Sequence, residues 1–221
     1  MFKNLLTITK EDVEVFNNES SPLKKFALSD PPDKFILHRL AKLLPANSVV
    51  VEVGTYLGAS MAVMSHANIN LEIHAYDLFD VGNYSPNQPE LFENSLGTGK
   101  LRTLENVGEF LKFYPNIQLH KVDHGPVAFD RQIDLFIEDS THRDPQLSWS
   151  LHNWLPKVKT NGLALLHDYR PWKDLGSKGR FPDVELQVET LTKTGNWNFL
   201  GSVQSEYFNV PGSYAILQKI K

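Results

Sequence analysis

The strongest constraint on the fold is the segment SVVVEV at residues 48–53. A strand with one face in water would alternate apolar and polar residues, whereas this run is apolar at almost every position. Such a run is typical of the centre of a parallel sheet, which is buried on both faces. Parallel neighbours need crossover helices, so strands and helices should alternate along the chain.

The rest of the sequence follows this alternation. A helix is predicted within SDPPDKFILHRLAKLLP, because apolar residues recur at helical spacing, Ser29 or Asp30 can cap its start and Pro45 follows its end. Further helices are predicted at 103–114, after Asp144-Pro145, and at 182–193, and the sequence KTNG is expected to form a turn. The other strands are predicted at 71–77, 117–123, 133–139, 163–168, 196–203 and 214–220.

These elements predict an α/β fold with one doubly wound, Rossmann-like domain. We expect a mostly parallel, seven-stranded sheet with an antiparallel C-terminal strand, at residues 47–221, preceded by an N-terminal helical extension at residues 1–46. Two long irregular insertions, 78–102 and 169–181, follow strands. Long loops at the carboxyl ends of strands usually cover a site.

Composition excludes several classes of function. The 221 residues carry a formal net charge of -4, so no basic field favours nucleic acid as a partner. No apolar run approaches the length of about 20 residues that a membrane span needs. The chain has no cysteine, which excludes disulfides, thiolate metal sites and a cysteine nucleophile. A cytoplasmic location fits these features, and assembly into a homo-oligomer stays open.

The turn VEVGTYLGAS leads from the first parallel strand into a helix, where ligands of such sheets bind. Gly54 allows a sharp turn and Gly58 allows close packing, but the dinucleotide fingerprint needs a third glycine. Glu52 would repel phosphates, and it suits a cofactor with a positive centre such as an amino-acid ammonium group. Tyr56 and Ser60 of this turn complete the residues that we expect to bind the cofactor.

Two further acids close the next strands. Asp77 ends the second strand, where an acid can hydrogen-bond a ribose diol. Asp123 ends the third strand, where it could recognise the amino group of an adenine. Their order on successive strand ends indicates an adenosyl cofactor more strongly than either acid does alone.

Together with the E-x-G-x-x-x-G turn, these acids make the chain resemble class I S-adenosylmethionine-dependent methyltransferases. The segment IDLFIEDSTHRDPQLSWSLHNWLPKVKTNGLALLHDY further resembles the metal-dependent sugar O-methyltransferases of the macrocin and mycinamicin type, and related small methyltransferases. The resemblance covers roughly residues 48–170. It implies transfer of a methyl group to a hydroxyl of a small molecule or sugar moiety.

The same resemblance implies the roles of four residues. Asp139 and Asp168 would ligate a divalent cation such as Mg²⁺, and His142 would be the general base. His167 stands where the family often has a second acid, and it could ligate the cation through a neutral imidazole. Because Mg²⁺ prefers oxygen ligands, Mn²⁺ or iron is an alternative.

Two other functions fit parts of the sequence. One is a catechol or caffeoyl-type O-methyltransferase, although the lysine that is usual near its first acid is replaced here by His142. The other is a non-catalytic Rossmann module that only binds a nucleotide cofactor. Acids at both expected metal positions favour an enzyme.

A thermal-shift measurement tests the predicted cofactor. S-adenosylhomocysteine should raise the melting temperature because it binds only the folded chain, and NAD should leave it unchanged. Stabilisation by NAD with no response to S-adenosylhomocysteine would contradict the prediction.

Overall fold

The computed structural model describes residues 6–11, 13–14, 31–79, 103–122, 128–169, 181–202, 204–205 and 214–221. The predicted cap at Ser29 or Asp30, the acid Asp123 and nearly all of both predicted insertions lie outside these residues. Among the described helices, none is long and apolar enough to cross a membrane.

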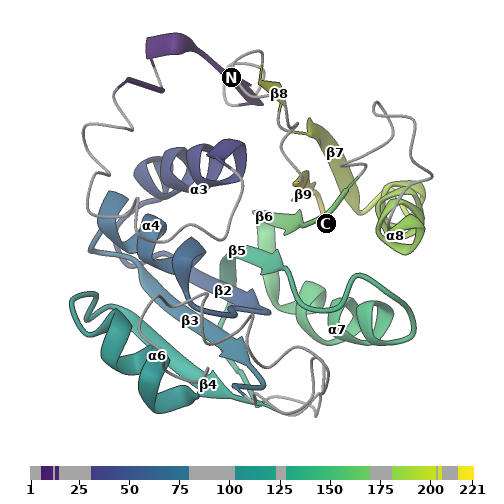
Figure 1. Cartoon of the computed structure of the whole chain (residues 1–221). Helices are drawn as coiled ribbons and strands as arrows, with labels where there is room; N and C mark the ends of the chain where they lie inside the picture. The colour runs from purple at the N-terminus through teal and green to yellow at the C-terminus, as the bar shows by residue number, and fades with distance from the viewer. Residues whose placement is uncertain are drawn as a thin grey trace.

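A seven-stranded sheet forms the centre of the fold (Figure 1), in the order β4-β3-β2-β5-β6-β9-β7. Strand β9 is antiparallel to both of its neighbours, and the other pairs are parallel, so the predicted sheet is confirmed. The strands are β2 (Val49–Val53), β3 (Glu72–Asp77), β4 (Ile117–Lys121), β5 (Ile133–Glu138), β6 (Val158–Leu166), β7 (Trp197–Ser202) and β9 (Ala215–Lys219).

Helices cover both faces of this sheet (Figure 1). One apolar core joins a sheet face to α3 (Pro31–Leu43), α4 (Ala59–Ala67) and α6 (Leu104–Leu111). A second core joins the other face to α7 (Gln146–Trp154), a short 3₁₀ turn, η2 (Leu155–Lys157), and α8 (Pro182–Lys193). The predicted doubly wound arrangement is therefore confirmed.

Two local predictions were wrong. The sequence KTNG does not end an element, because β6 continues through it from Val158 to Leu166. Instead, Asn161 takes a positive φ of 68° and the pairing of β5 with β6 shifts register, so the strand carries an irregularity where a turn was expected. The N-terminal segment is also not wholly helical, since β1 (Thr7–Ile8) pairs in parallel with β8 (Gln204–Ser205).

Asp134 fixes the edge of the sheet where β2, β5 and β6 begin. Its Oδ2 accepts a hydrogen bond of 2.8 Å from the amide of Val49, and its Oδ1 accepts one of 2.8 Å from Lys159 Nζ. This edge is opposite to the one where β5 ends and the polar residues of the DSTH sequence begin. Asp134 is thus a structural acid remote from the candidate site.

Replacing this acid should destabilise the fold. Asp134→Ala leaves the amide of Val49 without its acceptor, and we expect a loss of about 1–3 kcal/mol in the free energy of unfolding. Urea denaturation measures the change. An unchanged midpoint would show that water replaces the carboxylate without cost.

Candidate active site

The loop after β2 lies directly against the end of β5, and Gly54 permits this approach. Its φ is 92°, and a Cβ atom at this position would lie 2.1 Å from the carbonyl oxygen of Asp139. Any larger residue would push the two segments apart. Gly54 therefore sets the distance between the expected cofactor loop and the polar segment after β5.

The rest of this loop is fixed by backbone hydrogen bonds. Tyr56, at a φ of 53°, donates its amide to Asp77 Oδ2 at 2.7 Å, and Asp77 Oδ1 accepts from the amide of Phe79 at 2.9 Å. Gly58 precedes α4 at a φ of 79°, and a Cβ there would lie 2.5 Å from Leu111. Asp77 thus holds together the two loops that a ribose would contact.

Glu52 is fully buried beneath the loop. Ser60 Oγ donates a hydrogen bond of 2.5 Å to Glu52 Oε1, and Oε2 has no hydrogen-bond partner within the part of the chain that the structure describes. Burial raises the pKa of Glu52 to about 8. The hydrogen bond from Ser60 lowers the pKa, and the nearby charge of Asp139 raises it further. Among the described residues, Ser60 lines the adjacent cavity and Glu52 does not.

Two adjoining cavities open along the carboxyl ends of the strands, and Gly54, Asp77 and Ser140 line both. Their cavity volumes are about 50 and 250 Å³, so the described residues enclose less space than a typical small-molecule site does. The first cavity has aromatic walls from Tyr76, Trp149 and Trp154, which suit a flat base. The second is lined by Tyr56, Ser60, Asp139, His167 and Tyr214, among others.

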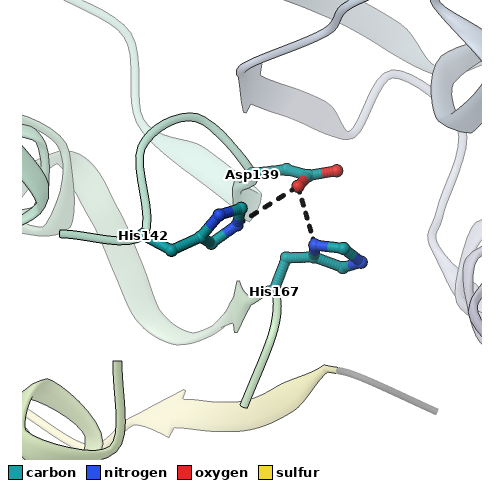
Figure 2. A group of neighbouring side chains, drawn as sticks. All are labelled: Asp139, His142 and His167. Carbon is teal, nitrogen blue, oxygen red and sulfur yellow. Dashed lines mark ion pairs between the residues drawn. The ribbon is translucent and has the colours of Figure 1, made fainter. Parts of the chain in front are cut away.

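Three potential ligands lie together beside the second cavity, and two of them, Asp139 and His167, line it. The ligand atoms of Asp139, His142 and His167 all lie within 4.8 Å of one another (Figure 2). Asp139 Oδ1 is 2.8 Å from His167 Nδ1 and 3.4 Å from His142 Nε2. Among the described residues neither nitrogen has a hydrogen-bond partner, although each is buried and lies close to the same carboxylate oxygen. Buried polar atoms left without partners in this way are typical of a site that holds a ligand.

Asp168, the other acid expected to bind a metal, contacts the far side of His142. Its Oδ2 lies 3.5 Å from His142 Nδ1, and its backbone takes a positive φ of 58°. Among the described residues it is not part of the group of three. His142 thus stands between two carboxylates, and its ring also packs on Phe181, 4.7 Å between centroids.

Electrostatics favours a charged pair at the centre of this cluster. Burial opposes ionisation of Asp139, but the neighbouring charge of His167, with a smaller contribution from His142, lowers its pKa below the usual value. Burial likewise disfavours a protonated His167, but Asp139 and Asp33 raise the pKa of His167 well above its usual value. The resting cluster therefore contains a carboxylate beside an imidazolium.

The glutamate before Asp139 fixes the shape of the turn. Glu138 is buried, and it accepts hydrogen bonds from the hydroxyls of Ser140 and Ser150. Burial raises the pKa of Glu138 to about 7, against these hydrogen bonds. Because Ser150 belongs to α7, Glu138 ties the turn to that helix and so holds Asp139 and His142 in place.

The sequence analysis missed three residues at this site. Asp33 of α3 is fully buried, and its Oδ2 lies 3.5 Å from His167 Nε2. Tyr214, just before β9, packs on His167 with ring centroids 4.9 Å apart, and burial and nearby carboxylates raise its pKa well above the usual value. Trp149 of α7 lines the first cavity.

Comparisons with known proteins agree with this arrangement. A family described as "Methyltransferase domain" matches residues 51–169, which is more than half of the chain. No curated protein matches the chain in sequence.

Several solved structures are similar in fold. A protein assigned as a caffeoyl-CoA O-methyltransferase from Staphylococcus aureus has a TM-score of 0.58 at 16% identity, covering 94% of this chain and 91% of its own. The O-methyltransferase TomG from Streptomyces achromogenes, in complex with S-adenosylmethionine, has a TM-score of 0.54 at 15% identity over 100% and 94%. An rRNA methylase from Streptococcus thermophilus has a TM-score of 0.55 at 15% identity over 88% and 99%.

The sheet order and the site at the carboxyl ends of the strands define a Rossmann-like methyltransferase fold. The chain belongs to the methyltransferase-domain family, and it is a class I S-adenosylmethionine-dependent methyltransferase. The family match supports an enzyme over a module that only binds a nucleotide cofactor.

The raised pKa of Glu52 predicts a pH-dependent stability. The folded chain keeps this proton up to about pH 8, whereas an ordinary glutamate loses it near 4.5, so the free energy of unfolding falls as pH rises through this window. Glu52→Gln removes the effect and should stabilise the protein at pH 8 more than at pH 5. A gain of about 1 kcal/mol corresponds to about 2–4 °C in melting temperature.

Melting curves of both proteins between pH 4 and 9 measure the difference. Subtracting one series from the other cancels the groups that they share. Parallel series would show that Glu52 is ionised in the folded protein at neutral pH.

Proposed function

We propose that this methyltransferase transfers the methyl group of S-adenosylmethionine to a hydroxyl oxygen of a small molecule or sugar moiety, assisted by a divalent cation. The observation that carries the proposal is the grouping of Asp139, His142 and His167, of which Asp139 and His167 line the second cavity. The expected cofactor loop, through Tyr56 and Ser60, lines the same cavity. A methyl donor and an activated oxygen can therefore meet there.

In this proposal the first cavity takes the adenosine portion of the cofactor. Its aromatic side chains offer stacking surfaces for adenine, and Asp77 stands at the junction of the two cavities, where the ribose would lie. Asp123, which we expect near the adenine amino group, lies outside the described residues. The residues that would hold the methionine portion are Gly54, Tyr56 and Ser60, which line the second cavity together with Asp139.

The donor set suits a divalent transition metal better than magnesium. One carboxylate and two imidazoles are ligands typical of Mn²⁺, Fe²⁺, Co²⁺ or Zn²⁺, whereas Mg²⁺ prefers oxygen atoms. A cation bound there lowers the pKa of a hydroxyl that it contacts, as it does for water. The protein supplies the orientation of the acceptor and excludes water, which places the oxygen in line with the methyl group.

His142 has two possible roles in this scheme. As a metal ligand it would use Nε2, while Asp168 holds Nδ1. As the general base expected from the sequence, it would accept the acceptor's proton on Nε2, with Asp168 again orienting the ring. We favour the ligand role, because Nε2 of His142 and Nδ1 of His167 both lie close to Asp139 Oδ1, and ligand atoms of the three residues lie within 4.8 Å of one another.

A caffeoyl-type acceptor is the second candidate. The only observation in its favour is the fold similarity to the Staphylococcus aureus protein, and at 16% identity this concerns the fold alone. The rRNA methylase likeness has the same limit. Formation of S-adenosylhomocysteine with panels of glycosides, catechols and RNA would distinguish these acceptor classes.

Metal titration separates the proposed roles. Asp139→Ala should weaken Mn²⁺ and Co²⁺ binding by at least about 10-fold and abolish metal-dependent transfer, because it removes the shared carboxylate. His142→Ala should weaken metal binding similarly if the ring is a ligand. If it is the base, metal affinity should stay and the rate should fall about 10²–10⁴-fold.

Asp134→Ala is the matched control, because it removes an acid from the opposite edge of the sheet. It should lower stability and leave metal affinity unchanged. S-adenosylhomocysteine should bind all three variants with nearly wild-type affinity. Full metal-dependent turnover by Asp139→Ala would rule out the proposed metal site.

A further inference from the structure

A carboxylate from outside the matched family region reaches this site. Asp33 lies in the first turn of α3, and none of its surface is exposed. Fully buried acids are rare unless they have partners. The free amides at a helix N-terminus stabilise an anionic side chain, which helps to explain why an acid is tolerated there.

Asp33 faces the imidazole nitrogen of His167 that points away from Asp139. Asp33 Oδ2 is 3.5 Å from Nε2, and on the other side of the ring Asp139 Oδ1 is 2.8 Å from Nδ1. The ring therefore bridges two carboxylates from different elements. The main-chain amide of His167 donates to the carbonyl of Glu138 at 3.0 Å, so the backbone of this residue is fixed as well.

The other imidazole of the cluster has an equivalent arrangement. Asp168 lies 3.5 Å from Nδ1 of His142, and Nε2 of that ring is 3.4 Å from Asp139. Each histidine thus has one nitrogen beside Asp139 and the other beside a second carboxylate. In metal sites such a carboxylate fixes the tautomer and the orientation of the ring and makes the imidazole a better ligand.

We infer that Asp33 is a positioning residue, which holds His167 with its Nδ1 lone pair directed at the metal. This role rests on the proposed function, because it assumes that a cation binds between Asp139, His142 and His167. With this role, α3 is part of the active site. The helix packs on α4 through apolar residues, and its Asp33 lies beside His167 at the end of β6.

A purely structural role predicts something different. If Asp33 only anchors α3, its replacement should reduce stability and leave the geometry of the metal site intact. If it positions His167, metal affinity and ligand geometry should change even where the fold is retained. Co²⁺ separates these cases, because its visible absorption depends on the number and arrangement of its ligands.

The experiment titrates the full chain with Co²⁺ and with Mn²⁺. Asp33→Asn keeps the shape of the side chain and removes its charge, and Asp33→Glu keeps the charge. We expect Asp33→Asn to weaken Co²⁺ binding about 10–100-fold and to alter the absorption spectrum. Asp33→Glu should recover part of the affinity. S-adenosylhomocysteine should bind each variant within about twofold of wild type.

Asp134→Asn is the control for the loss of a partly buried structural acid, and it should lower the melting temperature without changing the Co²⁺ spectrum. Wild-type Co²⁺ affinity and spectrum in folded Asp33→Asn would overturn the role of Asp33 alone. A wild-type chain that binds S-adenosylhomocysteine but neither cation would overturn metal assistance, and the role of Asp33 with it. The two failures are therefore distinguishable.

Discussion

The site depends on the close approach of two backbone segments. Gly54 lies against the carbonyl of Asp139, and even a methyl group at Gly54 would come within 2.1 Å of that oxygen. The amide of Asp139 also donates to the carbonyl of Val53 at 2.8 Å. This contact brings the expected cofactor loop beside the cluster of Asp139, His142 and His167. Methyl transfer requires donor and acceptor in line at short range, so this spacing is a condition for the chemistry.

Much of the fold could be predicted because it follows from patterns within short segments. The apolar run at 48–53 predicts a buried parallel strand. Because parallel strands are joined by crossover helices, it also predicts that strands and helices alternate along the chain. The convergence of Asp139 and His167 could also be predicted, because β5 and β6 are adjacent and parallel and their ends meet at one edge. The prediction of a turn at KTNG was wrong, because glycine and asparagine also occur at irregularities within a strand.

The residues that were missed depend on packing between distant segments. The apolar periodicity of α3 predicts which side of the helix is buried, but not that Asp33 lies over the end of β6. Tyr214 precedes the last strand, and its contact with His167 follows from β9 inserting between β6 and β7. Neither position carries a local signal in the sequence. Asp33 is an acid beside the apolar face of a predicted helix, but this pattern does not predict its contact with His167.

The shared wall of the two cavities has a consequence for ligand binding. Gly54, Asp77 and Ser140 border both spaces, and Ser140 is tied to α7 through Glu138 and Ser150. A molecule that settles on one side orders atoms that the other side also uses. The second ligand then causes a smaller loss of conformational entropy, because the residues of the shared wall are already ordered. Donor and acceptor should thus bind with positive cooperativity, and each should strengthen the other by the same factor.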